Sequence, residues 1–282
     1  MPYKDILLHL ESYPDPTPDL ALDQGLALCA ALGDQVTALA PHVSIPLKTN
    51  RMADFALKLG DMAKAEEGRS RQNAASLLDR FEAQARSLGV FGGRLSPEAE
   101  LFEIPELTAG LARTRDICVV PYGRESGAGQ GVAESMIFAS GRPVVIFRPN
   151  DARPAQKGLG TVLLAWDGSR SAAAAVAAAL PALTAARKVI VLTVLNEKAS
   201  ARAGASQDLI RHLERHGVAA EPMEFDSAGA RIGSVLDHVA LRAEADLLVM
   251  GAFGTSRARE FVLGGATRSM LEAPPVPVLL AH

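Results

Sequence analysis

The chain of 282 residues contains two copies of one pattern, and this internal repeat restricts its fold more than any other feature. Each copy opens with a short apolar run that ends in an acidic residue, residues 5–12 in the first copy and residues 161–168 in the second. Two later apolar runs recur as the pairs 116–120 with 246–250 and 142–146 with 276–280. We therefore expect two similar units in tandem.

Short apolar runs alternate with segments of helical periodicity in both copies, which predicts parallel strands joined by helices. The clearest helix follows residue 231, where the apolar positions share one face. These positions are Ile232, Val235, Leu236, Val239 and Ala240. The fold class that we predict is α/β, with two tandem flavodoxin-like (Rossmann-like) doubly wound domains, each a five-stranded parallel sheet of order 3-2-1-4-5.

The first copy is longer than the second, and its extra residues lie between Pro41 and Val90. Part of this segment has the period of a long helix that ends at Gly89, a residue type common just beyond a helix end. The apolar positions of this helix are Ala74, Leu77, Leu78, Phe81, Ala85 and Leu88.

A segment rich in Pro and Gly, residues 148–158, separates the two copies. We place one domain at residues 1–150 and the second at residues 158–282. Pairing of residues 144–147 with residues 278–281 would hide two sheet edges and make the chain a pseudo-dimer of its own domains. A further homodimer of whole chains is left open.

Composition excludes several functional classes. The 29 basic and 32 acidic residues are interspersed and give a net charge of -3, which disfavours a nucleic-acid partner or an anionic membrane surface. No apolar run reaches the ~18 residues that span a bilayer. The 2 cysteines are too few for a disulfide framework or a four-cysteine zinc site, so we expect a cytoplasmic protein with no structural metal.

The stretch most suited to binding a ligand is Gly251-Ala-Phe-Gly254, followed after nine residues by Gly264-Gly265-Ala266-Thr267. Glycines directly after a buried strand let the backbone turn sharply and approach a ligand. The second glycine pair and Thr267 present N–H groups at the start of a helix, where the free donors and the helix dipole favour phosphate. In an open α/β sheet, ligands bind at the carboxyl ends of the strands where the strand order reverses.

With these spacings the second copy resembles the universal stress protein A family, whose motif is G-x2-G-x9-G followed by Ser or Thr. The resemblance implies an adenine-nucleotide site in which Asp167 bonds adenine, Val194 packs on the base and the glycine motif holds ribose and phosphates. The site residues that it implies are Ala165, Trp166, Asp167, Val194, Met250, Gly251, Gly254, Gly264, Gly265, Ala266 and Thr267. It also implies ATP as the cofactor, with or without magnesium, and a role as a sensor or regulator in the stress response.

This chain departs from the family motif in both copies. Gly265 stands where the family has Ser or Thr, which removes a hydroxyl but keeps the N–H. The first copy has Pro121-Tyr-Gly-Arg124 in place of the glycine motif, and Pro121 has no N–H while Arg124 carries a Cβ. We therefore predict a single nucleotide site, in the second copy.

Two roles remain open for some residues. Asp167 can bind adenine or cap the helix that begins near Ser169, and Trp166 can line the site or only pack in the core. The sequence offers no placed general base or catalytic lysine, so we expect a binding protein that is at most a slow ATPase. The alternative is a nucleotide-free scaffold that binds a protein partner or a small metabolite.

Overall fold

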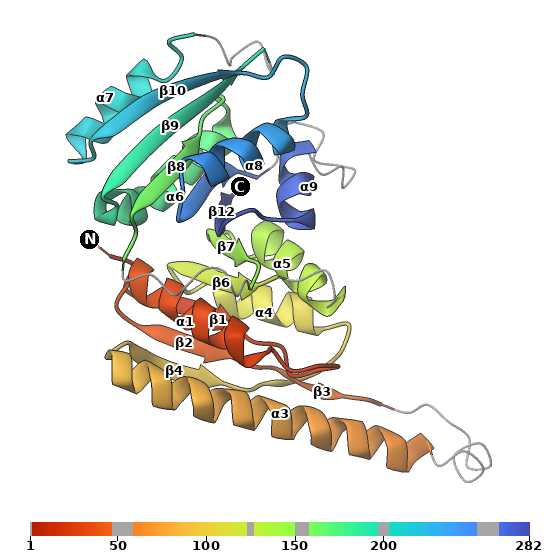
Figure 1. Ribbon diagram of the computed structural model, residues 1–282. Helices are drawn as coiled ribbons and strands as arrows, with labels where there is room; N and C mark the ends of the chain where they lie inside the picture. The colour runs from red at the N-terminus through yellow and green to blue at the C-terminus, as the bar shows by residue number, and fades with distance from the viewer. Residues whose placement is uncertain (1, 47–58, 123–126, 150–157, 197–202, 253–264) are drawn as a thin grey trace.

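The structure is a computed structural model that describes residues 2–46, 59–122, 127–149, 158–196, 203–252 and 265–282 (Figure 1). The elements of the first half are β1 (Ile6–His9), α1 (Asp19–Leu32), β2 (Val36–Leu39), β3 (His42–Ser44), α3 (Leu59–Leu88), β4 (Phe91–Leu95), β5 (Glu98–Glu100), α4 (Ile104–Ala112), β6 (Ile117–Pro121), α5 (Gly127–Ala139) and β7 (Val144–Phe147). Those of the second half are β8 (Thr161–Ala165), α6 (Arg170–Ala185), β9 (Lys188–Leu195), α7 (Gln207–Arg215), β10 (Ala220–Asp226), α8 (Ile232–Arg242), β11 (Leu247–Gly251), α9 (Gly265–Glu272) and β12 (Val278–Ala281).

The predicted α/β class is confirmed, but the two halves share one sheet. Ten strands lie in the order β10-β9-β8-β11-β12-β7-β6-β1-β2-β4. The pairs within each half are parallel, and β7 and β12 join the halves as an antiparallel pair with Val145 opposite Leu279. The pairing expected between residues 144–147 and 278–281 is therefore present, and it continues the sheet from one half to the other.

Helices cover both faces of this sheet, and two apolar clusters follow the alternation of the strand residues. On the first face, α1 and α3 of the first half and α6 and α7 of the second contribute to one cluster, which includes Leu8 and Leu164. On the second face, α4, α5, α8 and α9 contribute to the other cluster, which includes Leu7 and Leu163. Both clusters contain residues of both halves, because the sheet runs through the whole molecule.

The repeat is visible in matching hydrogen bonds at the amino ends of the central strands. Asp116 Oδ2 accepts from the backbone N–H groups of Lys4 and Asp5 at 2.8 and 3.1 Å. Asp246 Oδ2 accepts from Gly160 N and Thr161 N at 2.8 and 2.9 Å. The two aspartates occupy equivalent positions in the sequence repeat, so the duplication is preserved at the level of single contacts.

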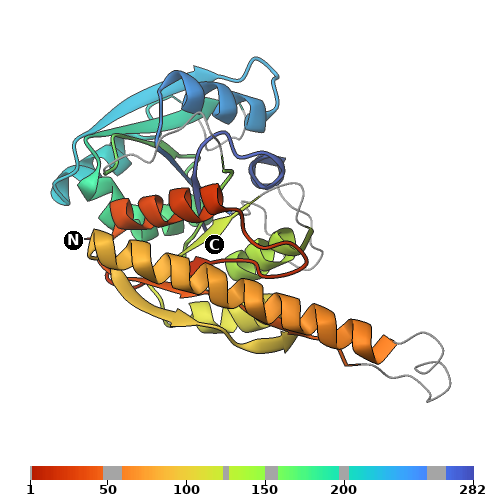
Figure 2. The same ribbon diagram turned by 60° about the horizontal axis from the view of Figure 1, so that its bottom comes forward.

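The extra residues of the first half include the long helix α3 and the short strand β3. The 30-residue helix α3 extends beyond the sheet (Figure 2). The two short strands β3 and β5 pair in parallel as a second sheet, which we call the ribbon, and β3 packs against α3. The helix ends as expected at Gly89, whose φ is +73°, but Leu88 is exposed and does not belong to the core.

Helix α8 shows the expected amphipathic pattern, with Val235, Leu236, Val239 and Ala240 buried. Ile232, at its first turn, is only partly buried and packs against the edge of the cluster. No helix among the described residues is long and apolar enough to cross a membrane.

Candidate nucleotide-binding site

Three of the residues expected in the site lie on the second face of the sheet, near the carboxyl ends of β8, β9 and β11. Met250 and Val194 are each 5% exposed, and Ala165 is partly buried against the same cluster. Ala165 pairs with Leu192 on one side, while its neighbour Leu164 pairs with Val249 on the other. The parallel register therefore brings these residues, which are far apart in sequence, to one end of the sheet.

Trp166 lies on the opposite face. Its ring packs against the first cluster, with α6 and α7, and its indole Nε1 donates to the carbonyl of Ala205 at 3.1 Å. The structure thus separates Trp166 from Ala165, Val194 and Met250. The reason is the strand alternation, which turns consecutive side chains to opposite faces.

Asp167 supports the turn that leads into α6. Its Oδ1 accepts from Ser169 N at 2.9 Å, and the residue is partly buried. The N-cap residue is Ser169, whose Oγ accepts from Ala172 N at 3.1 Å. The expected capping role thus falls on Ser169, and Asp167 orders the turn in front of it. Asp167 follows the last residue of β8 by two positions, at the end of the sheet where doubly wound folds bind their ligands.

Gly251 is needed for packing between a strand and a helix. A Cβ at this position would lie 2.4 Å from the backbone carbon of Ser171 and 2.5 Å from Ala172 N, both in the first turn of α6. The missing side chain therefore admits the start of α6 against the end of β11. The approach of a ligand to this glycine stays a prediction.

Helix α9 begins at Gly265 on the second face. A Cβ at Gly265 would meet no atom within 4 Å among the residues that the structure describes, so these residues leave the space beside it open. Thr267 is 2% exposed and Ala266 packs against the second cluster. Gly254 and Gly264, the other two motif glycines, lie outside the described residues.

The position of α9 is fixed by α8. A Cβ at Gly233 in the first turn of α8 would lie 2.2 Å from Ser269 Oγ and 2.4 Å from Ser269 Cβ, so only glycine permits this approach. Met270 and Leu271 anchor the other side of α9 in the second cluster. The sequence patterns did not single out Gly233 or Ser169. Ser169 can be recognised as a Ser directly before a helical segment, while a close contact of the Gly233 kind leaves no signal in one sequence.

The equivalent end of the first half is built differently. Tyr122 N donates to Phe147 O at 2.7 Å, as Ala252 N donates to Ala281 O at 2.7 Å, so Tyr122 is the structural counterpart of Ala252. Burial raises the pKa of Tyr122, and the nearby carboxylates Glu134 and Glu272 raise it further. A buried phenol thus replaces a methyl group beside Pro121. Gly123 and Arg124 lie outside the described part of the chain.

A metal ion has no preformed site in the residues that the structure describes, since these contain no group of three or more His, Cys, Asp or Glu side chains arranged to hold one.

Doubly wound α/β sheets bind their ligands beyond the carboxyl ends of the strands. Residues 158–282 match the model of the universal stress protein family, so the second half of this chain is similar to that family. No curated protein matches the sequence.

Solved structures of similar fold cover nearly the whole chain. A universal stress protein from Archaeoglobus fulgidus DSM 4304 has 14% identity and a TM-score of 0.68, over 98% of this chain and 95% of that one. A putative universal stress protein from Pseudomonas aeruginosa UCBPP-PA14 has 16% identity and a TM-score of 0.52, over 99% and 93%. A functionally unknown protein from Pseudomonas aeruginosa PAO1 has 15% identity and a TM-score of 0.53, over 99% and 92%. At these identities the likeness shows the fold alone.

Proposed function

We propose that the protein binds an adenine nucleotide, ATP, at one site in the second half and acts as a nucleotide-responsive regulator in the stress response. The observation that carries this proposal is the open start of α9. Among the described residues, no atom lies within 4 Å of the position that a Cβ of Gly265 would take, and the opposite side of the helix that begins there is anchored in the core. Backbone N–H groups and the dipole at the start of a helix favour phosphate.

The other parts of the ligand are assigned by position. Adenine and ribose would lie over the carboxyl ends of β8 and β11, between Asp167 and the second-face residues Ala165, Val194 and Met250. Gly254 and Gly264 would complete the phosphate loop. Trp166, on the first face, would not contact the nucleotide but would hold the segment around Ala205 through the hydrogen bond from its indole Nε1.

The domain roles follow from the same comparison. Residues 158–282 form the nucleotide-binding domain and residues 1–150 a degenerate partner, joined to it as a pseudo-dimer through β7 and β12 in a cytoplasmic protein. The family motif has Ser or Thr at position 265, so the glycine here weakens phosphate binding without closing the site. Binding, rather than hydrolysis, is the activity that this arrangement supports.

Calorimetric titration of Mg-ATP into the full-length protein tests the proposal with two matched variants. Gly265→Asp places a carboxylate at the start of α9 with no steric conflict, and a negative charge is favourable for the helix itself. We expect micromolar affinity for the wild type, a loss of about 100-fold in Gly265→Asp because the charge repels phosphate, and little change in Gly265→Ala. No heat of binding up to millimolar ATP, or equal binding by Gly265→Asp, would refute it.

A scaffold function is the second candidate, and the exposed apolar residues after the ribbon favour it. Phe102 is 76% exposed and Leu101 is 49% exposed, beside the segment that only the first half contains. If ATP does not bind, we expect these residues to contact a protein partner. In a pull-down, the wild-type protein should then retain this partner and the Phe102→Ser variant should lose it.

A further inference from the structure

Three polar side chains are brought together by the ribbon of the first half. In the parallel register His42 of β3 lies opposite Glu98 of β5. Ser96 precedes Glu98 by two residues and therefore points to the same side of the chain. The ribbon is held to the main sheet because Ala40 N donates to Leu95 O and His42 N donates to Pro97 O, at 2.9 and 3.0 Å.

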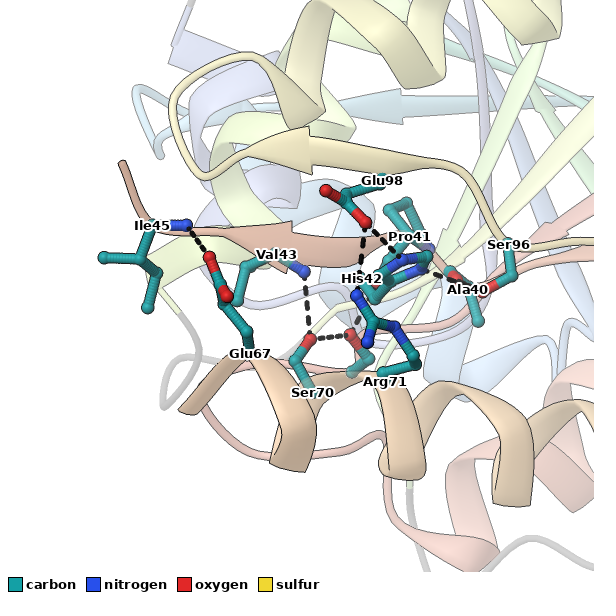
Figure 3. Close-up of polar contacts among 11 residues, drawn as sticks. Ala40, Pro41, His42, Val43, Ile45, Glu67, Ser70, Arg71, Ser96 and Glu98 are labelled. Atoms are coloured by element: carbon teal, nitrogen blue, oxygen red, sulfur yellow. Dashed lines mark hydrogen bonds and ion pairs between the residues drawn. The ribbon is translucent and has the colours of Figure 1, made fainter. Parts of the chain in front are cut away.

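The imidazole ring of His42 bridges the other two side chains (Figure 3). Its Nδ1 lies 3.3 Å from Ser96 Oγ, and its Nε2 lies 3.3 Å from Glu98 Oε2. A carboxylate can only accept, so Nε2 carries the proton and donates to Glu98. Nδ1 of the neutral ring is then the acceptor that faces the serine hydroxyl.

We propose that Ser96 is a nucleophilic serine that accepts an acyl or phosphoryl group from an activated ester or phosphonate. His42 is the general base, and Glu98 is a positioning residue that fixes the tautomer and orientation of the ring. This hydroxyl–imidazole–carboxylate relay lies where β2 and β4 end, at the carboxyl edge of the sheet.

The exposure of the three groups suits such a reaction. The side chain of His42 is 12% exposed and held in place, whereas Ser96 is exposed to a reagent from solvent. Glu98 Oε2 also accepts from Arg71 Nη2 of α3 at 3.3 Å, which fixes the carboxylate from a second element. The Ser96 hydroxyl also reaches Ala40 O at 3.0 Å and turns from that carbonyl to Nδ1 when it reacts.

The reaction of Ser96 balances when a fluorophosphonate is the electrophile. Ser96 Oγ attacks phosphorus, the O–P bond forms, the P–F bond breaks and fluoride leaves. The hydroxyl proton passes to His42 Nδ1 and from the ring to solvent. With an activated carboxylic ester, Ser96 Oγ forms a bond to the acyl carbon, the ester C–O bond breaks and the alcohol leaves with that proton. Neither reaction involves oxidation or reduction.

A fluorophosphonate probe on the full-length protein, followed by intact-mass measurement and peptide mapping, tests the proposal. We expect one label per chain at Ser96, absent in Ser96→Ala and about 100-fold slower in His42→Gln, the scale of a lost general base. Ser87→Ala is the matched control, because Ser87 is an exposed serine whose hydroxyl meets only Gln84 O at 2.7 Å, and labelling should not change.

The pH profile separates a base from a merely structural histidine. The groups that face His42 are Ser96, Glu98 and, through Glu98, Arg71. A general base must be unprotonated to accept the serine proton, so the labelling rate of the wild type should rise with pH, and it should rise less in Glu98→Gln. Labelling of Ser96 no faster than of Ser87 would overturn the proposal, as would a wild-type rate independent of pH. Both results can be read from the wild type even if His42→Gln is unstable.

Discussion

Single residues at the carboxyl ends of the central strands distinguish the two halves. The second half has Ala165 and Ala252 where the first has His9 and Tyr122, by the sequence repeat and by matching backbone bonds respectively. The sequence identified Ala165 through the resemblance to the family, whereas His9 carries no motif. The structure buries His9, which is 2% exposed. The free-energy cost of burying His9 could not be predicted from the sequence, because it depends on whether the folded chain places a hydrogen-bond partner beside the ring.

His9 makes stability depend on pH. Neither of its ring nitrogens has a hydrogen-bond partner among the described residues, and burial lowers its pKa from 6.5 to about 4. Between these two values the unfolded chain binds a proton that the folded chain does not, so the free energy of unfolding falls as pH drops from 6.5 to 4. The loss approaches about 3 kcal/mol.

His9→Leu should remove this dependence. Urea unfolding of the variant at pH 7 and pH 5 should show a smaller decrease than in the wild type, and a gain of about 1 kcal/mol at pH 7 from the lost polar group. His212→Gln, a change on an exposed helix surface, is the control. An unchanged pH dependence in His9→Leu would show that the ring is solvated in the folded state.

Gly251 and Gly265 belong to one sequence motif but should respond oppositely to substitution. Gly251→Ala would force the new methyl group against the backbone of α6 and should lower the free energy of unfolding by about 3 kcal/mol. Gly265→Ala meets open space and should change it by less than about 0.5 kcal/mol. Urea denaturation of both variants checks this, and equal effects would contradict the close approach of β11 and α6.

The long helix α3 shows what periodicity can detect and what it cannot. Its carboxyl-terminal half packs apolar residues on the sheet, which the helical period predicted. Its amino-terminal half buries Ala63 and Ser70, small or polar residues that give no apolar stripe. The ribbon strands of three residues are equally weak signals. The sequence therefore predicted the carboxyl-terminal half of α3, but neither its amino-terminal half nor the ribbon.

Buried serines connect this helix to the ribbon. Ser70 Oγ accepts from Val43 N at 3.0 Å and lies 2.8 Å from Ser12 Oγ, which donates to Pro41 O at 2.5 Å. Ser70→Ala leaves the Val43 N–H buried without an acceptor and should lower the free energy of unfolding by about 2 kcal/mol. Ser87→Ala on the exposed surface of the same helix should have no measurable effect. Chemical denaturation of the pair decides whether the serine network holds α3.

The two halves of the molecule share one sheet and both apolar clusters. The repeat predicted both doubly wound halves and the pairing of their last strands, because strand patterns and their order follow from the sequence. It did not predict that each apolar cluster contains residues of both halves. The outcome depends on the antiparallel β7–β12 pair, whose residues Val144, Val145, Leu279 and Leu280 are all 0% exposed.

Thermal unfolding should therefore be a single cooperative event. Scanning calorimetry should give one transition with a calorimetric enthalpy equal to the van't Hoff enthalpy, because separation of the halves exposes two apolar strand edges. Two resolved transitions would show that the halves unfold independently.

The number of nucleotides bound per chain tests the proposed function most directly. Native mass spectrometry of the full-length protein at saturating Mg-ATP should show one nucleotide per chain, since the glycine motif occurs in the second half of the sequence, while Pro121 and Tyr122 stand at the equivalent end of the first. A repeat with Gly265→Asp should show none. Two nucleotides per chain would contradict the assignment of the first half as degenerate, and none in the wild type would contradict the nucleotide site itself.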